Sequence, residues 1–245
     1  PENKDKNRFS NVLLTSAVIH YTRHYLACIS RENVPGGLTF VYCLCAYQGY
    51  ANASRQYIAA QGPLPSTVND FWRMVWEKRS QVIVMVTNCT ESGRVRQCSE
   101  QKTAYCCMKC LLTSILVSCK VLHTKTTSET RTVRHFHFTA WPDHGVPTGT
   151  EELIQFRGRI RQHVESSFSA GPTIVHCSAG VGRTGTLIAL DVLLQQLDKE
   201  KAVGISAFVQ QMRLSRPLMV QTEVRLFQSI ILKSIYCDRF IGNLA

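Results

Sequence analysis

The sequence predicts a single α/β domain, and three stretches carry that prediction. Residues 81–87 form a continuous apolar run of the kind found in central parallel strands. Residues 173–186 read as a short strand, a loop of small residues and the beginning of a helix. Residues 150–168 have the apolar spacing of an amphipathic helix. The length of 245 residues suits one such domain, with enough apolar side chains to fill its core.

Both helical patterns can be assigned an inward face. In 150–168, Thr150 is expected to be the N-cap, and Glu151 and Glu152 follow it in the first turn. The helix after the small-residue loop is expected to be amphipathic as well. The residues predicted to face inward are Leu153, Phe156, Ile160 and Val164 in the first helix, and Leu187, Leu190, Leu194 and Leu197 in the second.

The other elements can be placed along the chain. Residues 70–77 read as a helix, and its two tryptophans are interpreted as packing residues rather than ligand contacts. Its inward residues are predicted to be Phe71, Met74 and Val75. The further elements expected are a strand at 38–42, strands within 111–121, a strand at 133–138, a helix around 206–213 and a last helix that Met219 opens.

The composition limits the class of protein. A formal net charge of +11 fits acidic or phosphorylated partners, and no basic stripe interleaved with aromatic residues supports nucleic acid instead. No apolar run reaches about 18 residues, so no membrane span is expected, and residues 1–6 do not read as a signal peptide. The 11 cysteines are scattered and odd in number, which favours a reducing, cytosolic compartment over a disulfide scaffold.

The loop after residue 177 has the chemistry of an anion site. Gly180 and Gly182 let the backbone curl until successive N–H groups converge, and the next helix adds its positive N-terminus. Arg183 supplies a planar fork of donors suited to two phosphate oxygens. The same positive field favours the thiolate form of Cys177, which would make it a nucleophile aimed at phosphorus.

Two other interpretations of Cys177 agree less well with the sequence. A buried structural cysteine before a glycine-rich turn would explain the cysteine alone, but not its combination with Arg183 and Thr184. A cysteine protease is also disfavoured, because His176 is the preceding residue of a strand and points to the opposite face of the sheet.

The run His-Cys-Ser-Ala-Gly-Val-Gly-Arg-Thr-Gly at 176–185 resembles the signature loop of the protein tyrosine phosphatases. A second run, Trp-Pro-Asp-His-Gly-Val-Pro at 141–147, resembles the mobile acid loop of their tyrosine-specific branch. The matching blocks look most similar to catalytic domains of receptor-type members. The resemblance implies one phosphatase domain over residues 1–245, with a twisted mixed sheet and helices on both faces. It also implies a cytoplasmic domain of a single-pass membrane protein.

The resemblance also implies roles for individual residues. Asp143 would protonate the leaving tyrosine oxygen from its Pro- and Gly-bounded loop, a role that suits it better than neighbouring His144. Gln221 would position water, and Glu91 would orient the arginine unless it is only an exposed loop residue. The implied catalytic residues are Cys177, Arg183, Asp143, Gln221 and Thr184; the implied substrate-binding residues are Ser178, Ala179, Gly180, Val181, Gly182, Phe9 and Asn11.

Two stretches, 13–54 and 98–131, depart from the family pattern. A zinc site is conceivable in the second, but the spacing lacks two Cys-x-x-Cys arms and a variable β region is preferred. The cysteines that a zinc site would use are Cys98, Cys106, Cys107 and Cys110. The leading hypothesis is hydrolysis of phosphotyrosine in proteins through a cysteinyl-phosphate, without metal or organic cofactor. The rival is a phosphotyrosine-binding pseudophosphatase with little or no activity, because lost strands would open the core.

Overall fold

The computed structural model describes residues 45–47, 56–88, 90–91, 94–95, 107–112, 114–123, 129–142, 147, 150–167 and 171–221, of which 45–47, 90–91, 94–95 and 107–112 by their backbone alone. The helices are α2 (Val68–Glu77), α3 (Glu151–Ser166), α4 (Gly182–Glu200) and α5 (Ile205–Ser215). The strands are β1 (Cys45–Tyr47), β2 (Tyr57–Gln61), β3 (Val82–Met85), β4 (Thr90–Glu91), β5 (Arg94–Val95), β6 (Cys107–Leu112), β7 (Ile115–His123), β8 (Thr130–Phe138) and β9 (Thr173–Cys177).

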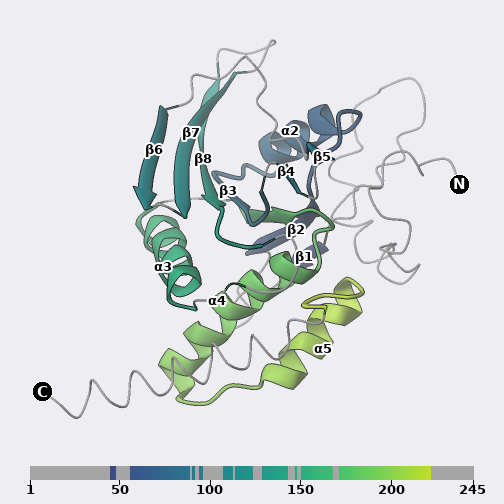
Figure 1. The fold of residues 1–245 in the computed structure, drawn as a ribbon, viewed down its shortest axis with the longest axis vertical. Helices are drawn as coiled ribbons and strands as arrows, with labels where there is room; N and C mark the ends of the chain where they lie inside the picture. The colour runs from purple at the N-terminus through teal and green to yellow at the C-terminus, as the bar shows by residue number, and fades with distance from the viewer. Residues whose placement is uncertain are drawn as a thin grey trace, which may run out of the picture.

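Seven of these strands form one mixed sheet in the order β1-β2-β9-β3-β8-β7-β6 (Figure 1). The four central strands β2, β9, β3 and β8 run parallel. On one side β1 pairs antiparallel with β2, and on the other β7 pairs antiparallel with β8 and β6 antiparallel with β7. The apolar run at 81–87 is therefore a central parallel strand, as predicted. Strands β4 and β5 form a separate two-stranded ribbon.

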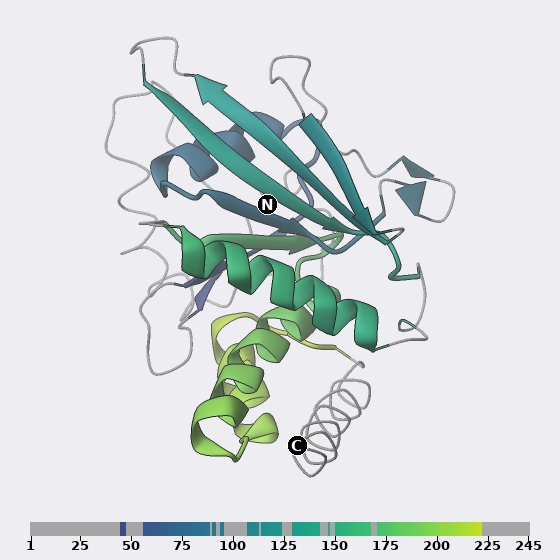
Figure 2. The ribbon, with the colours of Figure 1, turned by 90° about the vertical axis from the view of Figure 1, so that its left-hand side faces the viewer.

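Helices cover both faces of the sheet, which confirms the predicted fold class (Figure 2). The face that carries α3, α4 and α5 is called the α4 face, and the opposite face, which carries α2, is called the α2 face. Strand residues alternate between them: Tyr57 and Ala59 join the α4-face core, whereas Ile58 and Ala60 join the α2-face core. Phe71, Met74 and Val75 of α2 are buried in the α2-face core, as predicted.

Helix α4 differs from its prediction in one respect. The four leucines predicted to face inward are buried, but so are nearly all other residues between Gly182 and Leu194. The helix packs against strands β2 and β9 of the sheet and also contacts α3 and α5, so most of its length is shielded from solvent (Figures 1 and 2). Its amphipathic character is limited to the last turns, where Asp198, Lys199 and Glu200 are exposed.

The remaining predictions are mostly confirmed. Strands β6 and β7 occupy the second divergent stretch, and α3 and α5 lie where helices were expected. Thr150 precedes α3, but its hydroxyl makes no capping bond to the helix backbone. The helix expected from Met219 does not begin there, because residues 217–221 form turns. The strand expected at 38–42 and the helical residues beyond 221 lie outside the described residues.

Candidate active site

The central feature of the site is the loop between β9 and α4. Cys177 is the last residue of β9 and is only 4% exposed. The backbone N–H of Gly180 donates a hydrogen bond to the Cys177 sulfur, with 3.2 Å between nitrogen and sulfur. The loop therefore folds back over the sulfur instead of continuing the strand direction, as a nest of backbone donors requires.

Gly180 is the residue that this fold-back depends on. Its φ of +71° lies in the left-handed region, and a Cβ atom at this position would lie 2.2 Å from the carbonyl oxygen of Ala60. The loop is thus pressed against the end of β2, where the N–H of Gly62 also donates to the Ser178 carbonyl at 3.1 Å. Only glycine fits both the backbone conformation and the space.

A second arginine, Arg216, fixes the direction of the loop's peptide groups. It is fully buried, and it donates from Nη2 to the Ala179 carbonyl at 2.8 Å and from Nε to the Gly180 carbonyl at 2.9 Å. Because C=O and N–H of a trans peptide point in opposite directions, these bonds turn the N–H groups of Gly180 and Val181 away from Arg216. The Gly180 N–H is the one that meets the Cys177 sulfur.

Sequence reasoning missed Arg216. It follows the end of α5 and precedes a proline, a context that is usual for an exposed charge near a helix end. No local pattern indicates that this guanidinium is buried beneath a loop almost forty residues earlier in the chain.

Arg183 lies in the first turn of α4 and is half-buried. Its Nη1 donates to the Thr87 hydroxyl at 3.1 Å. The first backbone hydrogen bond of the helix runs from Gly185 N–H to the Val181 carbonyl, so the earlier N–H groups of the turn have no partner within the helix. The predicted combination of a guanidinium and a helix N-terminus is therefore present beside Cys177. Glu91, expected to orient this arginine, is described only by its backbone in β4.

The segment of Thr87 and Asn88 joins the cysteine loop to the start of the predicted acid loop. Besides receiving the bond from Arg183, Thr87 accepts a hydrogen bond at its carbonyl from the His137 ring at 2.8 Å. The Asn88 amide donates to the carbonyl of fully buried Trp141 at 3.4 Å. The chain thus enters the predicted acid loop close to Arg183. Asp143 itself lies outside the described residues, as do Phe9 and Asn11.

Gln221 is brought to the cysteine loop by a strained turn. Val220 has φ +69° and Gln221 has φ +40°, both rare for residues with a side chain. The Val220 N–H donates to the Val181 carbonyl at 3.1 Å, and Gly185 leaves the space that this approach needs. Arg213 holds the turn from outside by donating to the carbonyls of Met219 and Gln221. Gln221 itself is exposed.

The hydroxyl of Thr184 remains available. Thr184 is fully buried in the first turn of α4, and its oxygen has no hydrogen-bond partner among the described residues. A buried hydroxyl without a partner costs free energy, and such groups in native proteins require an explanation. This one is compatible with the predicted role toward the departing sulfur.

His176 lies on the opposite face of the sheet from Cys177, as predicted. Its ring packs edge-on against the ring of Phe71 in α2, with 5.6 Å between the ring centroids. It also lies parallel to the ring of His135, with 6.4 Å between the centroids. Burial lowers the pKa of His135 well below its ordinary value, and the nearby His176, Lys120 and His137 add to the shift. Burial also lowers the pKa of His137. These histidines belong to the α2-face layer and form no pair with Cys177.

In the described ranges, no three His, Cys, Asp or Glu side chains lie close enough together to hold a metal ion. Of the cysteines weighed for zinc, Cys98 and Cys106 lie outside these ranges, and Cys107 and Cys110 are described only by their backbone. The zinc hypothesis therefore gains no support.

A cysteine at the carboxyl end of a central parallel strand, beneath inward N–H groups and beside an arginine, is the arrangement of a cysteine-dependent phosphatase domain. The chain belongs to the protein-tyrosine phosphatase family, because the model of that family, described as protein-tyrosine phosphatase, matches residues 3–230.

Relatives of the chain include receptor-type members of this family. The chain is 45% identical to human receptor-type tyrosine-protein phosphatase H over 236 residues, which cover 91% of the chain and 20% of that protein. It is 41% identical to human receptor-type tyrosine-protein phosphatase eta over 240 residues, or 91% of the chain and 17% of that protein. Mouse receptor-type tyrosine-protein phosphatase C is 37% identical over 239 residues, or 92% and 18%.

The chain thus spans about a fifth of the length of these relatives. Among the residues that the structure describes, no helix combines the length and apolar character that crossing a membrane requires.

Proposed function

We propose that this chain hydrolyses phosphotyrosine in proteins through a cysteinyl-phosphate intermediate. The observation that carries the proposal is the orientation of the cysteine loop, whose Gly180 N–H donates to the Cys177 sulfur while Arg216 holds the carbonyls on the other side. Donors already oriented toward one point need no reorganisation when an anion arrives, which is the main source of electrostatic catalysis.

In the first step, the Cys177 sulfur attacks phosphorus and the bond from phosphorus to the tyrosine oxygen breaks. Arg183 and the N–H groups of the loop hold the non-bridging phosphoryl oxygens. Asp143 gives its proton to the leaving oxygen, because an unprotonated tyrosine phenolate is a poor leaving group. The loop residues with this binding role are Ser178, Ala179, Gly180, Val181 and Gly182.

In the second step, water attacks phosphorus, the bond from sulfur to phosphorus breaks and inorganic phosphate leaves. Asp143, now ionised, takes a proton from the water, and Gln221 positions that water. The Thr184 hydroxyl donates to the departing thiolate, a role supported by its burial without another described partner. All charges are handled by fixed donors, so the proposal includes no metal or organic cofactor.

The substrate and the cellular setting are part of the same proposal. Phe9 would stack on the phosphotyrosine ring, and Asn11 would contact the substrate backbone, more weakly than a carboxylate would. Residues 1–245 would form one phosphatase domain that acts on phosphotyrosine-containing proteins. Because the relatives are named receptor-type phosphatases and are about five times longer, we place the domain on the cytoplasmic side of a single-pass membrane protein.

The test is hydrolysis of a phosphotyrosyl peptide under reducing conditions, comparing the wild type with Cys177→Ser and Asp143→Ala. Without the nucleophile, turnover should fall to the background rate, and without the general acid it should fall about 10²–10⁴-fold. Both variants should still unfold cooperatively at a temperature near that of the wild type. Substantial turnover in Cys177→Ser would rule out the mechanism.

A wild type that binds the peptide without releasing phosphate would instead identify a pseudophosphatase. That rival was motivated by strands expected to be lost in the divergent stretches. The second of these stretches supplies β6 and β7, so the sheet keeps its antiparallel edge, and the proposal of an active enzyme is the stronger one.

A further inference from the structure

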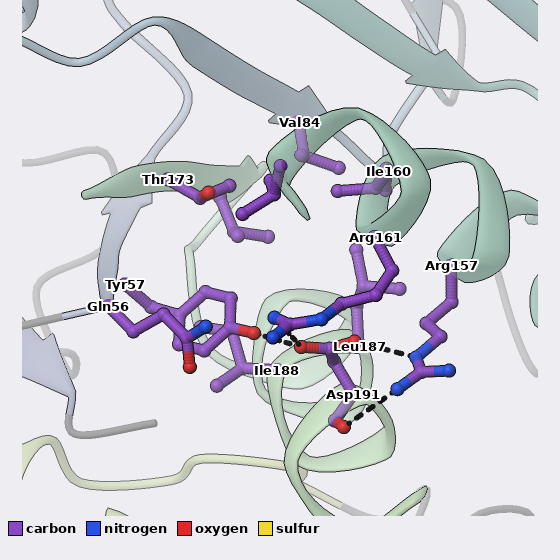
Figure 3. Close-up of a pocket in the computed structure, with 12 residues that line it drawn as sticks. Gln56, Tyr57, Val84, Arg157, Ile160, Arg161, Thr173, Leu187, Ile188 and Asp191 are labelled. Atoms are coloured by element: carbon purple, nitrogen blue, oxygen red, sulfur yellow. Dashed lines mark hydrogen bonds and ion pairs between the residues drawn. The ribbon is translucent and has the colours of Figure 1, made fainter. Parts of the chain in front are cut away.

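A buried polar cluster lies on the α4 face, away from the cysteine loop. The Asp191 cluster consists of Asp191 of α4, Arg157 and Arg161 of α3, and Tyr57 of β2, all drawn in Figure 3, together with Gln195 of α4. Asp191 is 7% exposed. Its carboxylate accepts hydrogen bonds from Arg157 Nε at 2.6 Å, from Arg161 Nη1 at 3.4 Å, from Gln195 Nε2 at 2.9 Å and from the Tyr57 hydroxyl.

The cluster ties α3 to α4 at more than one point. Besides its bond to the carboxylate, Arg157 donates from Nη2 to the backbone carbonyl of Asp191 at 3.2 Å. Burial and the adjacent carboxylate raise the pKa of Tyr57 well above its ordinary value, so its hydroxyl keeps the proton that it donates. One carboxylate thus joins three elements that are far apart in the sequence.

Apolar packing helps to hold α3 in place, because Leu153 and Phe156 are fully buried in the α4-face core. This packing is less complete beside the cluster, where a small cavity lies between α3, α4 and the sheet, with walls that include Ile160, Val164 and Leu187 (Figure 3). Side chains next to a cavity lose dispersion contacts on one side. The bonds from Arg157 and Arg161 to Asp191 are directional and add a specific constraint on the spacing between the two helices.

Two of the elements that the cluster joins, β2 and α4, reach the cysteine loop, and the third, α3, follows the predicted acid loop in the sequence. Helix α4 begins at Gly182, next to Arg183, and β2 ends where Gly62 contacts Ser178. Helix α3 begins at Glu151, a short segment after Asp143. Asp191 itself lies roughly 14 Å along α4 from Gly182, at 1.5 Å for each residue, so it does not touch the reacting atoms.

We infer that Asp191 is a positioning residue, which sets the acid loop relative to the cysteine loop by holding α3 against α4. This inference rests on the proposed phosphatase activity and extends it. In the first step the acid acts on the leaving oxygen, so a displaced acid loop should lower kcat/KM most for substrates with a basic leaving group. A displacement of about 1 Å can cost about 100-fold in rate.

The test compares kcat/KM for two substrates, because this ratio reports the first chemical step. A phosphotyrosyl peptide has a phenol leaving group that needs protonation, whereas 2,4-dinitrophenyl phosphate has a leaving group that departs without it. For Asp191→Asn and Arg157→Met, kcat/KM on the peptide should fall about 10- to 100-fold, and on the dinitrophenyl ester it should change little. Arg157→Lys keeps the positive charge but not the forked guanidinium. Its kcat/KM on the peptide should therefore lie between those of the wild type and Arg157→Met.

Two controls separate positioning from general destabilisation. Glu165→Gln removes an exposed partner of Arg161 within α3 and should leave both substrates unaffected. Tyr57→Phe removes the bond from β2 but keeps both arginines on Asp191, so it should lower stability without changing the ratio between substrates. If Asp191→Asn does not fold, the result for Arg157→Met decides whether the cluster has a positioning role.

The outcomes are distinct. An equal loss on both substrates, or no loss on the peptide, would overturn the positioning role of Asp191. A wild type without activity on either substrate would overturn the proposed function instead.

Discussion

The two faces of the sheet use alternate residues of the same strands, but they hold their polar groups in different ways. On the α4 face, Asp191 accepts four donors, and Arg216 donates to two carbonyls at the adjoining edge. On the α2 face, the ring of His135 stacks on those of His176 and His137, next to the apolar core of that face. The first arrangement fixes the directions of hydrogen-bonding groups, whereas the second fills volume, and burial there lowers the pKa of His135.

This difference separates two kinds of effect that a substitution can have. Changes that disturb the support of the cysteine loop should lower turnover by more than any loss of folded protein explains. Changes within the α2-face histidine layer should alter stability and its pH dependence and leave the chemistry intact. Each comparison below of a variant with its control tests whether effects on turnover and effects on stability can be separated in this way.

The largest effect is expected for Gly180→Ala. An alanine Cβ would meet the Ala60 carbonyl at 2.2 Å, on a backbone with φ +71°. We expect a loss of about 2–6 kcal/mol in the free energy of unfolding, since a left-handed backbone and overpacking each cost about 1–3 kcal/mol. Turnover of the remaining folded protein should fall about 100-fold, because the loop donors are displaced. Denaturant unfolding and peptide hydrolysis measure the two effects.

The matched control is Gly158→Ala. Gly158 lies within α3, and nothing is within 4 Å of a Cβ built there. This change should raise stability by about 0.5–1 kcal/mol, because alanine is the better helix former. Normal turnover in Gly180→Ala would mean that the loop does not depend on its contact with β2.

Arg216→Met should come next. The change leaves the Ala179 and Gly180 carbonyls without their donors, and each buried carbonyl left unpaired costs about 1–3 kcal/mol. We expect a fall in turnover of about 10- to 100-fold, because the N–H groups opposite these carbonyls lose their fixed direction. Binding of inorganic phosphate, measured by calorimetry, should weaken in parallel.

Arg159→Met provides the comparison for Arg216, since Arg159 is exposed on α3 and its loss should change neither stability nor turnover appreciably. Unchanged phosphate binding in a folded Arg216→Met protein would separate Arg216 from the anion site.

The sequence was sufficient where the site is local and insufficient where it is assembled from distant segments. Cys177, the glycines, Arg183 and Thr184 lie within eight consecutive positions, so a strand, a turn and a helix start place them together. Arg216 and Thr87 reach the same place only through tertiary packing. The burial of α4 on nearly all sides was also missed, because the pattern of leucines cannot show that two further helices lie against it.

The Asp191 cluster illustrates the same limit on the other side of α4. Tyr57, Arg157 and Asp191 come from three elements separated by up to 134 positions in the chain. The sequence around an aspartate in a leucine-rich helix does not predict which distant side chains will form hydrogen bonds with it. The positions of Asp143, Phe9 and Asn11 rest on the resemblance to relatives and stay predictions.

The smallest effect concerns the α2 face and pH. The pKa of His135 is lowered below about 6.5, first by burial and then by His176, Lys120 and His137, so the folded state binds this proton less readily than the unfolded state does. The contribution of neutral His135 to the free energy of unfolding should therefore be complete above about pH 6.5, and it should decrease as the pH falls below that value. Between pH 7.5 and 5.5 the loss from this residue is at most about 1.4 kcal/mol.

His135→Phe keeps an aromatic ring against His176 and removes the proton. Its thermal midpoint should fall less between pH 7.5 and 5.5 than that of the wild type, by at most about 3–6 °C. Lys120 should not obscure the comparison, because it is present in both proteins. Turnover at pH 7.5 should stay near the wild-type value if the α2-face histidine serves packing alone. A large loss of turnover in a stable His135→Phe protein would show that the two faces are chemically coupled through the neighbouring positions 176 and 177.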